Sequence, residues 1–155
     1  MIDVIDNILE EQIIKDIEWC LLDNTNIAWF IMNSNLEHHF WSKDEYSNRY
    51  NDICRAWIDL YIKPTALIKV KGKLYPKTKK IKEWKMKPDV DWKHENCMTS
   101  ILYINTNNGY TKFKDGTIIE SIRNRLVTFP AHLEHTGSTC TDENFRCVIN
   151  MNYYK

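Results

Sequence analysis

From Thr65 to residue 153 the chain alternates hydrophobic and polar residues in short runs, and this period of two limits the fold more than any other feature. Turn residues separate the runs. Such alternation is typical of strands that bury one face. We therefore expect strands near residues 66–74, 81–86, 99–105, 109–113, 117–121, 125–129, 131–136 and 145–153.

The first part of the chain predicts helices instead. Apolar residues at spacings of three and four predict an amphipathic helix over about residues 6–23, with Asp6 or Asn7 as its cap. A serine followed three residues later by a glutamate predicts a second helix over about residues 42–61. Between these helices, the apolar run 27–32 predicts a buried strand.

Helices followed by seven or eight short strands predict an α+β fold that contains a β-sandwich or a barrel. A chain of 155 residues fits one domain, and no linker interrupts it. We expect a single domain over residues 1–155, with a helical part at about 1–63 and a strand core at about 65–153. No apolar run approaches the roughly 18 residues of a membrane span, so we expect no membrane partner.

Positive charge is concentrated in one stretch, although the net charge of the chain is zero. Between Lys63 and Lys87 there are ten lysines and one acidic residue. This basic stretch would suit a nucleic acid or an acidic protein. Over residues 68–74 the lysines alternate with apolar residues, which favours a strand whose outer lysine face guards a sheet edge. The sequence leaves both interpretations open.

Cysteine usage and the N-terminus bear on the compartment. The five cysteines show no paired spacing, and the acidic start lacks the basic and apolar regions of a secretion signal. We therefore expect free thiols and a reducing, cytoplasmic location.

Three polar residues fall on predicted strands among apolar neighbours. Tyr103 lies on the strand at 99–105, His135 on that at 131–136, and Arg146 at the head of the last strand. If these mixed faces point into a barrel, its interior has the character of a small-molecule site. A buried arginine needs an anion, and its planar guanidinium suits a carboxylate.

Over about residues 65–153 the chain resembles the iron(II)- and 2-oxoglutarate-dependent oxygenases of the prolyl-hydroxylase-like kind. The resemblance depends on an ordered set of short segments: Asp89-Val-Asp91, Leu102-Tyr-Ile-Asn105, Gly109-Tyr-Thr-Lys-Phe113, Asn124-Arg-Leu-Val-Thr-Phe-Pro130, His135-Thr-Gly137 and Arg146-Cys-Val-Ile-Asn150. It implies a double-stranded β-helix, which is a jelly-roll or cupin-like barrel, with the N-terminal helices packed on the sheet.

The resemblance also implies roles for single residues. His135 matches the distal iron ligand and Asp91 the carboxylate ligand. Arg146 matches the partner of the distal carboxylate of 2-oxoglutarate, and Tyr103 a second donor to it. Trp92 would form a wall of the substrate site. The implied cofactors are iron(II) and the cosubstrate 2-oxoglutarate.

The sequence departs from the family pattern at Asp89, where the family has the first histidine ligand. Two carboxylates and one imidazole still bind a divalent cation, but this harder set implies weaker iron and 2-oxoglutarate binding and more tolerance of manganese or magnesium. His94 is the alternative metal ligand if the strand shifts its register. His132 is the other candidate for this ligand position, but it lies three residues before His135 and therefore points the other way on a strand.

The resemblance implies a dioxygenase that hydroxylates a small molecule or a peptide, with a prolyl or other peptidyl side chain as the first candidate by analogy. A different reading is a non-catalytic binding or structural protein with a degenerate oxygenase fold, which Asp89 favours. A third is a nucleic-acid-modifying oxygenase, which the basic stretch permits.

Overall fold

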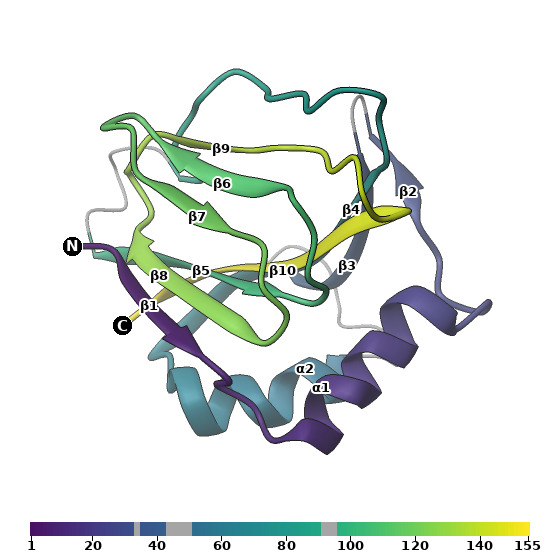
Figure 1. Cartoon of the computed structure of the whole chain (residues 1–155). Coiled ribbons are helices and arrows are strands. Elements are labelled where there is room, and N and C mark those ends of the chain that lie inside the picture. Colours follow the sequence, from purple (N-terminus) through teal and green to yellow (C-terminus); the bar gives the residue numbers. More distant parts are fainter. Residues whose placement is uncertain (33–34, 43–50, 91–95) are drawn as a thin grey trace.

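The computed structural model describes residues 1–32, 35–42, 51–90 and 96–155 (Figure 1). Over these ranges the strands form a seven-stranded sheet, in the order β1-β8-β5-β10-β4-β3-β2, and a three-stranded sheet, in the order β7-β6-β9. All strand pairs are antiparallel. The elements are β1 (Asp3–Asp6), α1 (Glu11–Glu18), β2 (Phe30–Ile31), β3 (Leu36–Ser42), α2 (Asn51–Trp57), β4 (Ala66–Pro76), β5 (Cys97–Tyr103), β6 (Tyr110–Phe113), β7 (Ile118–Glu120), β8 (Arg125–Pro130), β9 (His135–Gly137) and β10 (Phe145–Tyr154). The predicted α+β class is confirmed.

The elements form layers around the large sheet. Figure 1 shows α1 and α2 on one face of this sheet and the three-stranded sheet on the other. Two apolar clusters fill the spaces between the layers. One joins the helices to the sheet and includes Ile14, Ile17 and Trp57. The other lies between the two sheets and includes Phe113 and Phe129. The apolar stripe from which the first helix was predicted is thus buried against the sheet.

The first helix begins later than its pattern predicts. Residues 3–6 form β1, which pairs with β8, and α1 begins at Glu11 and continues through a π-helical turn to Asp23. Asn7 has a left-handed φ of 54°, which ends the strand. The expected cap at Asp6 or Asn7 is therefore wrong, because Asp6 pairs with β8 and the helix begins only at Glu11, with Glu10 at the cap position.

Two side chains between β7 and β8 fasten the N-terminal segment to the barrel. The Asn124 amide accepts a hydrogen bond from the Leu9 backbone N–H at 3.0 Å and donates one to the Leu9 carbonyl at 2.8 Å. The Arg123 guanidinium donates to both carboxylate oxygens of Glu18 and of Glu11 on α1. Contacts between distant parts of the chain thus set the position of α1.

Most of the later strands lie where the alternation predicts them, and the exceptions are strands that are shorter than expected. The expected strand at 81–86 contributes only an isolated bridge at Glu83, and that at 131–136 is shortened to β9. The expected buried strand at 27–32 is the two-residue β2, whose Phe30 and Ile31 are exposed. These segments run along sheet margins, where few ladder partners exist. The predicted second helix is present from residue 51, and residues 43–50 lie outside the described part.

β4 is an interior strand, so the expectation that its lysines guard a sheet edge is wrong. It pairs with β10 on one side and with β3 on the other. Lys69, Lys71 and Lys73 alternate with buried or half-buried neighbours and share one face of the sheet. That face is turned toward the three-stranded sheet, because Lys73 lines the pocket between the sheets.

Within the described ranges no helix is long and apolar enough to cross a membrane. The five cysteines are buried and free, as their spacing predicts.

Candidate functional site

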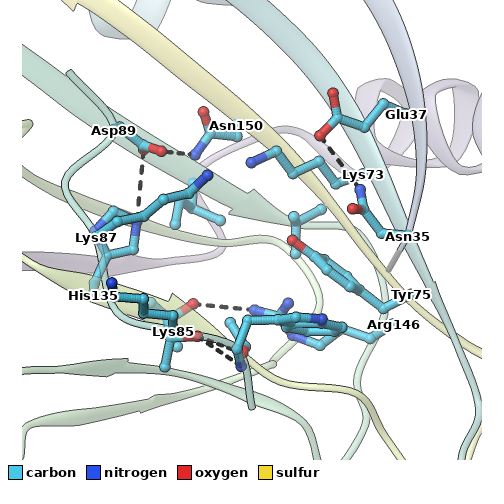
Figure 2. A pocket seen from close by; sticks show the side chains of 16 residues that line it. Asn35, Glu37, Lys73, Tyr75, Lys85, Lys87, Asp89, His135, Arg146 and Asn150 are labelled. Atoms are coloured by element: carbon cyan, nitrogen blue, oxygen red, sulfur yellow. Dashed lines mark hydrogen bonds and ion pairs between the residues drawn. The ribbon is translucent and has the colours of Figure 1, made fainter. Parts of the chain in front are cut away.

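A cavity of about 380 Å³ lies between the two sheets. Figure 2 shows the side chains that line it, which come from both sheets and from the segment before residue 90. The residues used below are Lys73, Tyr75, Asp89, His135, Arg146 and Asn150.

Strand register determines the order of these residues along the cavity. Arg146 on β10 lies opposite Tyr75 on β4, and Val148 lies opposite Lys73. Asn150 follows two residues further along the same face of β10. Alternate residues of a strand share a face and are roughly 6.7 Å apart. Each pair of facing residues on β4 and β10 forms one row across the floor of the cavity. Successive rows therefore contain Arg146, Lys73 and Asn150.

Arg146 is a buried cation that points into this cavity, with 1% of its surface exposed. Its Nε donates to the Ser121 hydroxyl at 2.8 Å, and its Nη2 donates to the Thr111 hydroxyl at 3.0 Å. The Tyr75 ring centroid lies 5.3 Å from Cζ of the arginine. No carboxylate of the described residues lies within 4.0 Å of the guanidinium. A buried charge held only by neutral groups favours an anionic ligand.

Tyr103 lies beneath the cavity rather than in its lining. It is fully buried, and its hydroxyl donates to the Thr111 hydroxyl at 2.8 Å. Burial raises the pKa of Tyr103 against the opposing effect of Arg146, so the phenol keeps its proton. The Thr111 oxygen thus accepts two hydrogen bonds, from Tyr103 and from Arg146, and its own proton is available for a ligand in the cavity.

His135 lies toward the other end of the cavity with one ring nitrogen directed at Asp89. Its Nδ1 lies 2.9 Å from the Leu133 carbonyl, which can only accept a hydrogen bond, so Nδ1 carries a proton. The rings of Phe129 and Phe113 lie against the imidazole. Fixing Nδ1 as the donor leaves Nε2 as the atom that can bind a cation, which is the usual arrangement of a metal-binding histidine.

Asp89 is held by neutral donors and by nearby cations. Its Oδ2 accepts hydrogen bonds from Asn150 at 3.0 Å, from Thr99 at 3.2 Å and from Asn152 at 3.4 Å. Burial by itself raises the pKa of this carboxyl. Lys73, His135, the Asn150 hydrogen bond and Lys69 outweigh burial and hold the pKa well below its ordinary value. The Asp89 side chain is therefore a carboxylate at neutral pH.

The separation of Asp89 and His135 is close to that of two ligands of one metal ion. Oδ2 of Asp89 lies 3.6 Å from Nε2 of His135. Two ligand atoms at about 2.1 Å from one metal are roughly 3.0–3.4 Å apart for angles between octahedral and tetrahedral. The two side chains would therefore have to approach each other slightly to share a metal ion. Asp91 lies outside the described residues, and within those residues no three histidine, cysteine or acidic side chains form a metal-binding group. Among the described residues, Asp89 and His135 could therefore supply two ligands.

Two other predicted site residues, Trp92 and His94, also fall in the stretch 91–95, which the structure does not describe. His132 is exposed and lines a separate hollow with Phe113 and Lys114, away from the cavity that contains His135. The structure thus brings Asp89, His135 and Arg146 to one cavity.

Sequence reasoning missed Lys73, Tyr75 and Thr111 as residues of the site. Tyr75 and Arg146 are far apart in the sequence, and only the β4–β10 register places them together. One signal for Lys73 was present, because lysines at alternate positions share a strand face. The direction of that face depends on which strands pair with β4.

No protein-family model and no curated protein sequence matches the chain. Among solved structures, a prolyl hydroxylase from Trichoplax adhaerens, in complex with a hypoxia inducible factor oxygen degradation domain peptide fragment, superposes with a TM-score of 0.72 and 14% identity, covering 99% of this chain and 83% of that one.

Two further solved structures have the same fold. The viral collagen prolyl hydroxylase from Paramecium bursaria Chlorella virus-1, in its 2-oxoglutarate complex, gives a TM-score of 0.61 at 14% identity over 99% of this chain and 96% of that one. HygX from Streptomyces hygroscopicus, with nickel and 2-oxoglutarate bound, gives 0.68 at 8% identity over 99% and 82%. This chain therefore has the jelly-roll fold of the iron(II)- and 2-oxoglutarate-dependent oxygenases, as its sequence motifs predict.

Proposed function

We propose that the protein is an iron(II)- and 2-oxoglutarate-dependent dioxygenase that hydroxylates its substrate. One observation carries the proposal: a single cavity holds the buried guanidinium of Arg146, which has no carboxylate partner among the described residues, and the Asp89–His135 pair, whose facing atoms are 3.6 Å apart. The first group suits a carboxylate and the second suits a divalent cation. A 2-oxo dicarboxylate that chelates a metal ion would satisfy both groups with one ligand.

Separate residues would bind the metal and the cosubstrate. Asp89, His135 and Asp91 would hold the metal, which is iron(II) or, on this oxygen-rich set, manganese or another divalent ion. Arg146 and the Thr111 hydroxyl would hold the far carboxylate of 2-oxoglutarate. Iron(II) with 2-oxoglutarate and dioxygen supplies the oxidising chemistry for C–H hydroxylation when bound.

For the substrate we propose a peptidyl side chain, with proline first. The support is the Trichoplax adhaerens prolyl hydroxylase, which was solved with a peptide fragment and whose fold this chain shares. A small-molecule substrate is the alternative. Trp92 would contribute to the substrate wall, and His94 would replace Asp89 if the segment around it adopts another register.

A non-catalytic binding protein is the second candidate function, and the surroundings of Asp89 favour it. Three neutral side chains, Asn150, Thr99 and Asn152, direct their donors at one oxygen of this carboxylate. Such a set also stabilises a buried carboxylate that has only a structural role. Nucleic-acid modification remains a prediction of the basic stretch alone, and salt-sensitive oligonucleotide binding would test it.

An anaerobic titration with iron(II) and 2-oxoglutarate tests the proposed function. When the oxo acid binds iron(II) through its keto and carboxylate oxygens, a weak visible charge-transfer band appears. We expect this band with the wild-type protein and expect its loss in Arg146→Ala. Arg125→Ala is the matched control, because Arg125 pairs with Asp6 outside the cavity. A band unaffected by Arg146→Ala would contradict the role of Arg146, and the absence of any band would favour the non-catalytic candidate.

A further inference from the structure

Lys73 places a second cation in the floor of the cavity. It lies on β4 opposite Val148, one row along from the Tyr75–Arg146 pair. Figure 2 shows its side chain extending into the cavity between Tyr75 and the Asp89–Asn150 end. Because β4 is bounded by β10 and β3, the backbone of Lys73 has little freedom to turn the side chain elsewhere.

The amino group of Lys73 has no carboxylate within 4.0 Å among the described residues. The two carboxylates that line the cavity bind other groups. Glu37 pairs with Lys71 at 3.1 Å, and Asp89 accepts from Asn150 and faces His135. Burial lowers the pKa of Lys73, but Tyr75, Asp89 and Glu37 raise it above its ordinary value, so the group is an ammonium.

The spacing of the two cations suits a short dicarboxylate. Arg146 and Lys73 belong to neighbouring rows of the same sheet face, roughly 6.7 Å apart along the strands. A five-carbon diacid lying along the strands would present one carboxylate to each row. With Lys85 and Lys87, which also line the cavity, the lining carries four cations against Glu37 and Asp89. This excess favours a dianion.

We propose that Lys73 is an anion-binding residue of this site and that the cavity captures a short dicarboxylate between Arg146 and Lys73 without a metal ion. The inference rests on the proposed function in one respect, because it takes the dicarboxylate to be the proposed cosubstrate. Asp89 adds a negative charge where the family pattern has a neutral imidazole, and Lys73 offsets it. The anion is thereby attracted by the protein's own charges.

One consequence separates this mode of binding from metal chelation. Chelation needs the keto oxygen of 2-oxoglutarate, whereas two cations recognise only its two carboxylates. Glutarate, which lacks the keto group, should therefore bind the metal-free protein about as tightly as 2-oxoglutarate does. Added metal should strengthen the binding of 2-oxoglutarate and leave that of glutarate nearly unchanged.

Isothermal titration calorimetry of chelator-treated protein with 2-oxoglutarate and with glutarate tests the inference. We expect both to bind, and expect Lys73→Met to weaken both by about tenfold or more, as for a lost charge-assisted hydrogen bond. Lys73→Arg keeps the charge and should retain most of the affinity. Lys79→Met is the matched control, because it removes one charge from the same basic stretch but lies outside the cavity lining and is exposed. Circular dichroism verifies that each variant is folded.

Each outcome supports or overturns a separate claim. If Lys73→Met binds both diacids like the wild type, or if the metal-free protein binds neither while the metal-loaded protein binds 2-oxoglutarate, the inference about Lys73 is wrong and the proposed function stands. If neither form of the protein binds 2-oxoglutarate, the proposed function fails as well. Equal losses in Lys73→Met and Lys79→Met would show a general charge effect and overturn a specific role for Lys73.

Discussion

Gly109 lies directly against the side chain of Arg146. A Cβ built on Gly109 would be 2.6 Å from Cδ of Arg146 and 2.9 Å from the Thr139 carbonyl oxygen. We expect Gly109→Ala to displace the arginine and weaken 2-oxoglutarate binding by on the order of tenfold, because the guanidinium would lose its alignment with the cavity. Calorimetric titration of the metal-loaded protein measures this.

Gly116→Ala is the matched control for that substitution. Gly116 has a φ of 92° and nothing near the site of its Cβ, so alanine there adds backbone strain without touching the cavity. It should lower stability and leave 2-oxoglutarate binding unchanged. Similar binding losses in both variants would mean that Gly109 acts through general stability rather than through Arg146.

Asp89→His should tighten iron(II) binding by on the order of tenfold, because it replaces a carboxylate with the imidazole of the 2-His-1-carboxylate set. The quantity to measure is the dissociation constant for iron(II) under anaerobic conditions. Asp115→His, at an exposed turn outside the cavity, controls for an added histidine. Unchanged binding in Asp89→His would show that another residue already fills this ligand position, with His94 the first candidate.

Asn124 should contribute to stability in two separable ways. It is buried, has a left-handed φ of 63°, and makes two hydrogen bonds with the Leu9 backbone. Asn124→Gly loses the hydrogen bonds but tolerates the backbone conformation, so we expect a loss of about 2 kcal/mol in the free energy of unfolding. Asn124→Ala should lose about 1 kcal/mol more through backbone strain. Urea denaturation of the two variants measures the difference, and equal losses would contradict the strain.

The buried thiols should make the protein less stable at alkaline pH. Burial raises the pKa of Cys20 to about 11 and that of Cys147 to about 12, whereas an unfolded thiol has a pKa of about 8.5. Each buried neutral thiol makes a stabilising contribution that is complete below the pKa of the unfolded thiol. This contribution is lost as the pH rises toward the pKa of the folded thiol, by up to about 1.4 kcal/mol per pH unit for each thiol.

Urea denaturation between pH 8 and pH 10 measures this dependence, and Cys147→Ala should make it shallower by the share of one thiol. Lysines and tyrosines titrate alike in both proteins, so the comparison isolates the cysteine. An identical pH dependence in the variant would contradict the assigned shift.

The sequence predicts the positions of the strands better than it predicts which strands pair with each other. The alternation locates β4, β5 and β10 within a few residues, because burial of one face imposes the period directly on the chain. It does not tell which strands pair, and for this reason the lysines of β4 were expected at an edge. Asp6 was similarly expected at a helix start, although pairing with β8 makes it part of a strand.

The residues of the candidate site likewise fall into those that the sequence predicts and those that only strand pairing brings to the site. Asp89, His135 and Arg146 were predicted as site residues because ordered motifs mark them along the sequence, and the structure places all three around one cavity. Tyr75 and Lys73 belong to no motif, and they enter the site through the register between β4 and β10. Tyr103 was expected to contact the ligand, but its hydroxyl reaches Thr111, so its contribution passes through that threonine.

The interior position of β4 and β10 also affects how the protein must be handled. Each strand has a hydrogen-bonded neighbour on both sides, so the cationic rows they carry keep their places whether or not a ligand is bound. The cavity then has a standing positive potential that attracts any multivalent anion of suitable size. Citrate and phosphate buffers should compete with the ligand, and affinities measured in them will understate those in a buffer of monovalent anions.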